Sequence, residues 1–156
     1  METFIDFHCH LADEQYSYQE ALNIVETCQK EKVILFSMST DLNDYQTNLK
    51  FSNSSNVFIG FGIHPYEAHK IIEQKNWQEK IEEILKNKHP KLLFIGEVGL
   101  DFYKIPETAK EQTEVFEYFV YLATKYELPL SLHTRNAEEK ICQILLKYQQ
   151  QILLYQ

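Results

Sequence analysis

The sequence predicts an α/β protein of the (β/α)8 TIM-barrel type, and three observations predict this fold. Short apolar segments alternate with amphipathic helical segments along the chain. The apolar segments are almost continuous, which is typical of parallel strands covered by helices and joined by right-handed crossovers. An open doubly wound sheet also meets this description. Titratable side chains at the ends of several strands favour the barrel, because its strand ends converge on one mouth.

Six segments have the length and apolar content of strands. The first begins at Phe4 and ends in two histidines, His8 and His10. The fourth runs directly into Glu97, and the fifth ends at His133. The six segments are residues 4–10, 32–38, 57–62, 92–96, 129–133 and 151–155.

Five helices are expected between these strands. Ser17 can cap the first, because a serine side chain accepts a hydrogen bond from the opening turn of a helix. Apolar residues recur at helical spacing in residues 18–30, 41–49, 77–88, 106–126 and 137–148. We expect a single domain over residues 1–156. Since a barrel of this type has about 250 residues, about six strands and five helices would make it incomplete.

Composition limits the classes of function. With 44% hydrophobic residues the chain can bury a substantial core, and its net charge is −8. That charge argues against a broad basic surface for nucleic acid, which needs clustered lysine and arginine. It leaves open a phosphate site built around a metal ion.

The three cysteines and the N-terminus bear on location. Cys9, Cys28 and Cys142 have unrelated spacings, without the paired pattern of a zinc module or a disulfide framework. The chain enters a strand almost at once and has no apolar run near 18 residues, so we expect neither a signal peptide nor a membrane span. A cytoplasmic or nuclear location is the expectation.

The His-x-His pair at the end of the first strand is the first candidate metal site. Residues two apart on a strand face the same side, so His8 and His10 can hold one ion. Asp6 has the same parity and is a candidate for supporting these ligands or for taking part directly. The alternative is a solvated strand end with two ordinary surface histidines.

Further titratable groups follow other strands. His64, Glu97 and His133 are expected at the same mouth as the first pair. Imidazoles with a carboxylate suit zinc, manganese or similar cations, whereas calcium prefers more oxygens. Glu97 has two oxygens and can bridge a pair of ions, which would lower the pKa of bound water. The expected chemistry is metal-assisted hydrolysis, with a phosphoester as the substrate that two ions serve best.

Four motifs follow one another along the chain: DFHCHL (6–11), GIHP (62–65), GEVGLDFY (96–103) and LPLSLHTRNA (128–137). Together and in this order they resemble the motifs of one family, the TatD-related metal-dependent deoxyribonucleases. The helix between the last two motifs is also similar to the pattern of that family.

The resemblance implies a metallo-dependent hydrolase of TIM-barrel fold. Such a protein hydrolyses DNA, often from 3′ ends or in single strands and in the 3′-to-5′ direction. It would use up to two divalent ions, Mg, Mn or Zn. His8 and His10 would hold one ion, Glu97 would bridge and act as the catalytic residue, and His133 would hold the second.

The chain also departs from the family pattern. The family has a further metal-binding histidine after the sixth strand and a catalytic aspartate near the end of the last strand. Neither is matched here, so the expectation is a fragment, or a protein whose open strand edges are covered by a second copy or by another protein.

Substrate contacts are expected from His64 and Arg135. The alternative for His64 is a rigid His-Pro pair in a loop. Arg135 can pair with a phosphate through its fork of donors, or with Glu138 or Glu139 in a salt bridge.

Three residues after the fourth strand are further candidates. Asp101 is either an outer hydrogen-bond partner of a metal-ligating histidine or a turn cap. Phe102 and Tyr103 are candidates for stacking on a base.

Two classes of function therefore remain. The first is a divalent-metal hydrolase of phosphodiester bonds. The second is a catalytically weak or inactive barrel fragment that serves as a metal-binding or interaction module.

Overall fold

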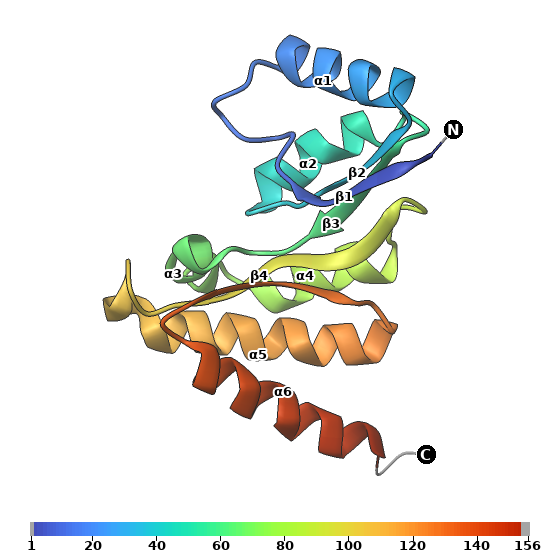
Figure 1. Cartoon of the computed structure of the whole chain (residues 1–156). Coiled ribbons are helices and arrows are strands. Elements are labelled where there is room, and N and C mark those ends of the chain that lie inside the picture. The colour runs from blue at the N-terminus through green and yellow to red at the C-terminus, as the bar shows by residue number, and fades with distance from the viewer. Residues whose placement is uncertain (1, 154–156) are drawn as a thin grey trace.

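Five parallel strands form the centre of the protein, as seen in a computed structural model that describes residues 2–153 (Figure 1). The spatial order of the strands is β1-β2-β3-β4-β5, the same as their order in the chain. A doubly wound sheet reverses its strand order at a switch point, whereas a barrel adds each strand beside the last. The predicted barrel-type fold is therefore confirmed.

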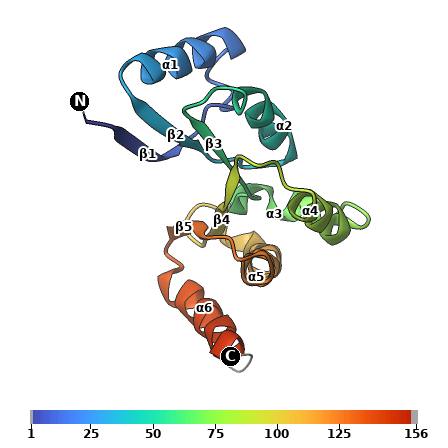
Figure 2. The same cartoon turned by 90° about the vertical axis from the view of Figure 1, so that its right-hand side faces the viewer.

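Helices cover the outer face of the sheet. Figure 2 shows α1, α2, α4 and α5 on one side of the strands. Between residues 2 and 153, no helix combines the length and apolarity needed to cross a membrane. The strands are β1 (Phe4–Cys9), β2 (Val33–Ser37), β3 (Val57–Phe61), β4 (Leu92–Asp101) and β5 (Leu130–Arg135). The α-helices are α1 (Tyr18–Lys30), α2 (Leu42–Phe51), α3 (Ala68–Ile72), α4 (Trp77–Lys86), α5 (Ala109–Tyr126) and α6 (Glu138–Leu153), and Pro65–Glu67 and Pro106–Thr108 form short 3-10 helices.

The main core lies between the sheet and these helices. Fully buried apolar side chains from the strands, such as Ile59, Phe61 and Leu100, belong to the same cluster as Val25 of α1 and Phe119 of α5. Apolar contacts of this kind supply most of the free energy that holds helices against a sheet.

The start of α1 follows the prediction. Ser17 caps the helix and forms a capping box with Glu20, whose carboxylate accepts a hydrogen bond from the Ser17 backbone N–H at 2.8 Å. This reciprocal pair satisfies donors that the first turn of a helix leaves free.

The predicted sixth strand, residues 151–155, is wrong where the structure describes it. Residues 151–153 continue α6, while residues 154 and 155 lie outside the described residues. The prediction ended the helix at Tyr148, but no glycine or proline follows to stop it. Glutamine and leucine are good helix formers, so helical geometry persists. The described chain therefore has five strands and six α-helices.

Apart from shifts of one to three residues at several element ends, two further differences from the prediction concern α3 and β4. The short helix α3 was not predicted, because five residues carry too little periodicity to be seen. The strand β4 continues to Asp101, so Glu97 lies within the strand and not at its end.

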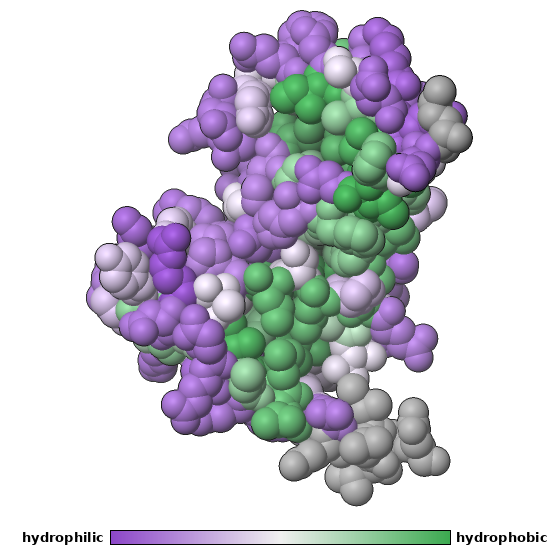
Figure 3. Space-filling model, in the orientation of Figure 1, coloured by the Kyte–Doolittle hydropathy of each residue, from purple (hydrophilic) through white to green (hydrophobic). Residues whose placement is uncertain are grey.

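The inner face of the sheet is aromatic and partly open. Phe36 stacks on Phe7 and Phe58 at centroid distances of 5.1 and 5.3 Å and meets the edge of Phe94 at 4.8 Å. On the edge strand β1, Phe7 remains 58% exposed. Figure 3 shows apolar surface both in the region of β1 and lower down near β5 and α6.

A buried polar network supports the loops at the carboxyl ends of the strands. Asn48, on α2, is completely buried. Its side-chain oxygen accepts a hydrogen bond from the Ser37 hydroxyl at 2.7 Å, and its amide donates to the Ser39 hydroxyl at 3.1 Å. Ser37 in turn accepts the backbone N–H of Leu11 at 3.0 Å, directly after His10.

Replacing Asn48 by alanine should lower the free energy of unfolding by about 2–3 kcal/mol, because it removes the acceptor of the buried Ser37 hydroxyl and a donor to the buried Ser39 hydroxyl. Chemical denaturation followed by circular dichroism measures this. The matched control is Asn53→Ala, at an exposed position, where a change below about 0.5 kcal/mol is expected. Equal effects of the two substitutions would contradict a structural role for the network.

Candidate metal centre

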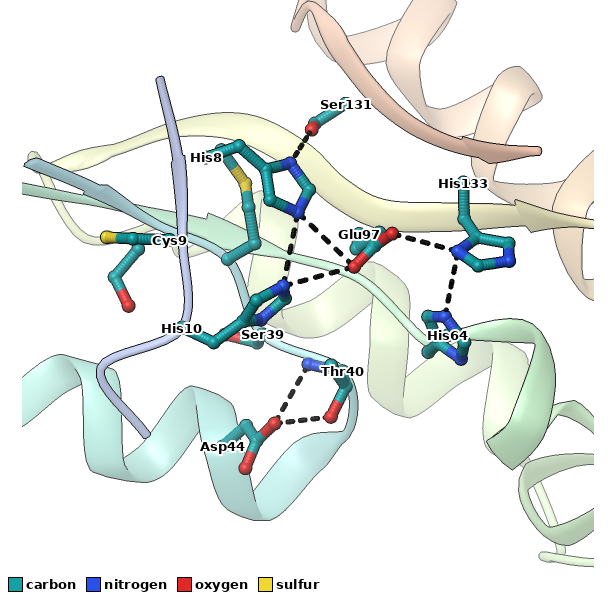
Figure 4. Close-up of polar contacts among 12 residues, drawn as sticks. His8, Cys9, His10, Ser39, Thr40, Asp44, His64, Glu97, Ser131 and His133 are labelled. Atoms are coloured by element: carbon teal, nitrogen blue, oxygen red, sulfur yellow. Dashed lines mark hydrogen bonds and ion pairs between the residues drawn. The ribbon is translucent and has the colours of Figure 1, made fainter. Parts of the chain in front are cut away.

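Glu97 lies between two groups of imidazoles, and each of its oxygens faces a different group (Figure 4). Oε2 is 3.4 Å from His8 Nε2 and 3.3 Å from His10 Nε2. Oε1 is 3.1 Å from His133 Nδ1. Glu97 is only 8% exposed. The carboxylate therefore has the arrangement of a bridge between two sites.

The first donor set consists of His8, His10 and Glu97. The two imidazole Nε2 atoms are 3.1 Å apart. Ligand atoms that surround a zinc ion tetrahedrally at about 2.0–2.1 Å would lie about 3.4 Å from one another. The spacing and the chemistry of this set thus fit a borderline divalent cation.

Asp6 does not join this set. Its carboxylate accepts the backbone N–H of His8 at 3.1 Å, and the side chain is exposed. Asp6 therefore supports the backbone of the ligand strand, and no described contact joins it to an imidazole or to Glu97.

The second group contains His133, oriented by Asp101. His133 Nε2 is 3.2 Å from Asp101 Oδ2, and Asp101 is completely buried. When the Nε2–H group donates a hydrogen bond to this carboxylate, Nδ1 of the neutral ring has its lone pair directed toward Glu97. Asp101 also caps a turn, since Oδ1 accepts the N–H groups of Tyr103 and Lys104. Asp101 thus caps a turn and at the same time contacts a candidate metal ligand.

His64 lies beside His133 but is a poor metal ligand. Its Nδ1 accepts the backbone N–H of Tyr66 at 3.2 Å, so in a neutral ring the proton is on Nε2. That Nε2 is 3.1 Å from His133 Nδ1. Burial lowers the pKa of His64 to about 4, which keeps the ring neutral. Although His64, Glu97 and His133 are close enough to share an ion, the His64 tautomer makes it a hydrogen-bond donor.

The charges of the centre are strongly coupled. Hydrogen bonding to Glu97 raises the pKa of His10 and of His133, although burial opposes this in both. Burial by itself would raise the pKa of Glu97, but hydrogen bonds from His10 and His133 outweigh it and hold that pKa well below its usual range. The carboxylate is therefore charged at neutral pH and available as a ligand.

Arg135 stands over an aromatic ring near the second group. Its guanidinium carbon is 5.9 Å from the ring centroid of Tyr103, which is 67% exposed. In the described part of the chain, no ion pair joins Arg135 to Glu138 or Glu139. The arginine therefore keeps its donors available.

A cavity of about 640 Å³ opens beside the centre. His10, His64 and Glu97 contribute to its wall. Much of the remaining lining is acidic, and its residues come from three segments far apart in the sequence, the loop after β1, the start of α2 and the short helix after β3, so no local pattern predicts them: Asp13, Glu14, Asp41, Asp44 and Glu67. Lys70 also lines the cavity but is paired with Glu67 at 2.8 Å.

A parallel sheet whose strands bring imidazoles around a shared carboxylate defines a class of β/α-barrel proteins with a histidine–carboxylate centre. Within that class the family is clear. The chain belongs to the TatD related DNase family, whose model matches residues 5–154.

Three proteins named as a hydrolase or a nuclease are similar to most of this chain. An uncharacterised metal-dependent hydrolase of Methanocaldococcus jannaschii, MJ1582, is 30% identical over 144 residues, covering 90% of this chain and 54% of that protein. The human deoxyribonuclease TATDN3 is 28% identical, covering 85% and 52%. The human 3′-5′ RNA nuclease TATDN2 is 32% identical, covering 94% and 20%. The chain thus spans about half the length of the first two.

A solved structure shows the same fold. The crystal structure of a TatD family hydrolase from Entamoeba histolytica matches with a TM-score of 0.80 at 22% identity, covering 94% of this chain and 54% of the other.

Proposed function

We propose that this chain is a divalent-metal-dependent phosphodiesterase acting on nucleic acid, a TatD-like deoxyribonuclease that removes nucleotides from 3′ ends. The observation that carries the proposal is Glu97, whose two oxygens face separate imidazole groups. His8, His10 and Glu97 would hold one ion, and Glu97 and His133 the second. Ions so placed supply an activated water and neutralise charge on a phosphate.

Two supports come from the relatives and the donor chemistry. TATDN3 and TATDN2 are named as a deoxyribonuclease and an RNA nuclease. Imidazole and carboxylate ligands suit zinc or manganese, while magnesium would rely more on oxygen ligands and water. Manganese is therefore the first ion to test, with zinc and magnesium beside it.

The test combines metal binding with nucleotide release. The 156-residue protein is incubated with single-stranded DNA carrying a label at either end, with and without added Mn²⁺. We expect metal-dependent release from the 3′ end, lost in a variant carrying both His8→Ala and Glu97→Ala. A folded protein that binds Mn²⁺ but releases no nucleotide would instead support the metal-binding module. A protein that binds no ion would refute both.

Substrate contact is proposed for His64, Arg135 and Tyr103. The Nε2–H of His64 points into the second group as a neutral donor, which suits a phosphate oxygen. Arg135 can pair with a phosphate while Tyr103 offers an exposed ring for a base.

Replacing Arg135 by alanine is expected to raise KM for single-stranded DNA about 10-fold with little change in kcat, because a charged hydrogen bond to phosphate is lost. The control Arg135→Lys keeps the charge without the planar fork and should recover part of the affinity. Steady-state kinetics at fixed salt measures both. A fall in kcat alone would place Arg135 outside substrate binding.

Metal affinity should increase with pH. Hydrogen bonding to Glu97 raises the pKa of His10 and of His133 above that of an ordinary imidazole, so both rings hold their protons to a higher pH. An imidazole must lose its proton to bind an ion, and affinity therefore falls as pH falls through these raised values. Calorimetry should show the Kd for Mn²⁺ falling by about 10-fold or more from about pH 6 to about pH 8, with proton release. A Kd independent of pH would contradict imidazole ligation.

Self-association through the open edges of the sheet remains a prediction. Phe4, Ile5 and Phe7 of β1 are exposed, and large exposed apolar surface on an edge strand favours association. Sedimentation at several protein concentrations tests it, and a monomer at every concentration would refute it.

A further inference from the structure

A serine on β5 contacts a histidine on β1, although these strands form the two ends of the sheet. His8 Nδ1 and Ser131 Oγ are 3.0 Å apart (Figure 4). The other ring nitrogen of His8, Nε2, faces His10 and Glu97. The contact therefore spans the interior of the curled sheet and ends at the candidate metal centre.

The chemistry of imidazole gives this contact a role. A neutral ring has one N–H and one lone pair. When Nε2 gives its lone pair to an ion, the proton is on Nδ1, and this N–H needs an acceptor. In the described part of the chain, Ser131 Oγ is the hydrogen-bond partner of His8 Nδ1.

We infer that Ser131 is a positioning residue: its hydroxyl accepts the Nδ1–H of His8 and so holds that ring with Nε2 aimed at the ion. The inference rests on the proposed function, since it needs His8 to be a ligand. It parallels the way Asp101 holds His133. A serine hydroxyl is a weaker acceptor than the carboxylate that holds His133.

The surroundings of His8 show why such a partner matters. The His8 side chain is 40% exposed and lies on an edge strand with exposed neighbours. Packing therefore restrains this ring little, and a free imidazole would lose rotamer freedom on binding an ion. A fixed hydrogen bond reduces that loss.

The sheet is built to keep Ser131 in place. Ser131 and His133 are two apart on β5 and thus face the same side, toward the centre. Behind Ser131, a Cβ added at Gly96 would lie 2.6 Å from the serine Cβ. The glycine on β4 therefore leaves room for β5 to approach closely, one residue before Glu97.

The test is a double-mutant cycle on metal affinity. Mn²⁺ is titrated by calorimetry into wild type, Ser131→Ala, His8→Ala and the double variant. If Ser131 acts through His8, Ser131→Ala weakens binding at the site of His8, His10 and Glu97 about 10- to 100-fold. The same substitution then has no further effect in the His8→Ala background.

Two further readouts separate positioning from structure. Ser131→Thr keeps the hydroxyl and should recover most of the affinity, and the visible spectrum of bound Co²⁺ should change in Ser131→Ala while circular dichroism does not. Wild-type affinity in Ser131→Ala, or an equal loss with and without His8, would overturn the inference, whatever the threonine variant does. Wild-type protein that binds no Mn²⁺ would instead refute the proposed function.

Discussion

Replacing Glu97 by glutamine is expected to abolish binding of both ions, with at least about a 100-fold loss of affinity, because outer hydrogen-bond partners alone account for 10- to 100-fold. Glutamine keeps the shape of the side chain but removes its charge. One of its two terminal atoms becomes an NH₂ group, which cannot be a ligand. Since each oxygen of Glu97 faces a different imidazole group, neither group keeps a carboxylate. Release of nucleotides should fall in parallel.

A second readout applies to the metal-free protein. Glu97 is the largest source of the raised pKa of both His10 and His133. In Glu97→Gln both pKa values should fall, which an NMR titration of the ring protons detects. The matched control is Glu114→Gln on the exposed side of α5, where neither affinity nor histidine pKa should change. Retention of one tightly bound ion in Glu97→Gln would refute the bridging role.

The sequence predicted most of the framework for a simple reason. Buried parallel strands must be apolar on both faces, so they stand out as short runs, and their order follows from the alternation with helices. The His-x-His pair was equally visible, because a strand has a period of two. His8, His10, Glu97 and His133 accordingly come together in the structure.

Other features depend on three-dimensional contacts that carry no local pattern. A single serine has no recognisable sequence pattern, and the role of Ser131 can be inferred only from its contact with His8 in the structure. The tautomer of His64 depends on a backbone N–H two residues later. The error at residues 151–153 has the opposite cause. The apolar run after the helix resembles a strand locally, but no helix stop separates it from α6, so the helix continues.

Replacing Gly99 by alanine is expected to destabilise the protein by about 3–4 kcal/mol, the sum of a strained backbone and an overpacked contact. Gly99 has φ of +153°, a conformation that side-chain-bearing residues rarely adopt. A Cβ at this position would lie 1.9 Å from the carbonyl oxygen of His133, its partner across β4 and β5. Both atoms belong to paired backbones, so neither can move without separating the strands.

The effect of Gly99→Ala on metal binding should be selective. Displacement of β5 moves His133, so the second ion is lost. His8 on β1 and His10 directly after it keep the first ion, at reduced affinity because Ser131 moves with β5 away from His8. The matched control is Gly60→Ala in the same sheet, where the new Cβ would press on the side chain of Met38 and lie 3.0 Å from the carbonyl oxygen of Gly96, so its closest neighbour is a side chain and not paired backbone. This neighbour can shift, and a smaller loss of stability follows. Thermal and urea denaturation measure the stability of the two variants, and titration with Mn²⁺ measures how many ions each binds. Equal stability of the two variants would contradict the prediction, and so would an equal loss of both ions in Gly99→Ala. Either result would show that the close approach at Gly99 does not hold His133 in the centre.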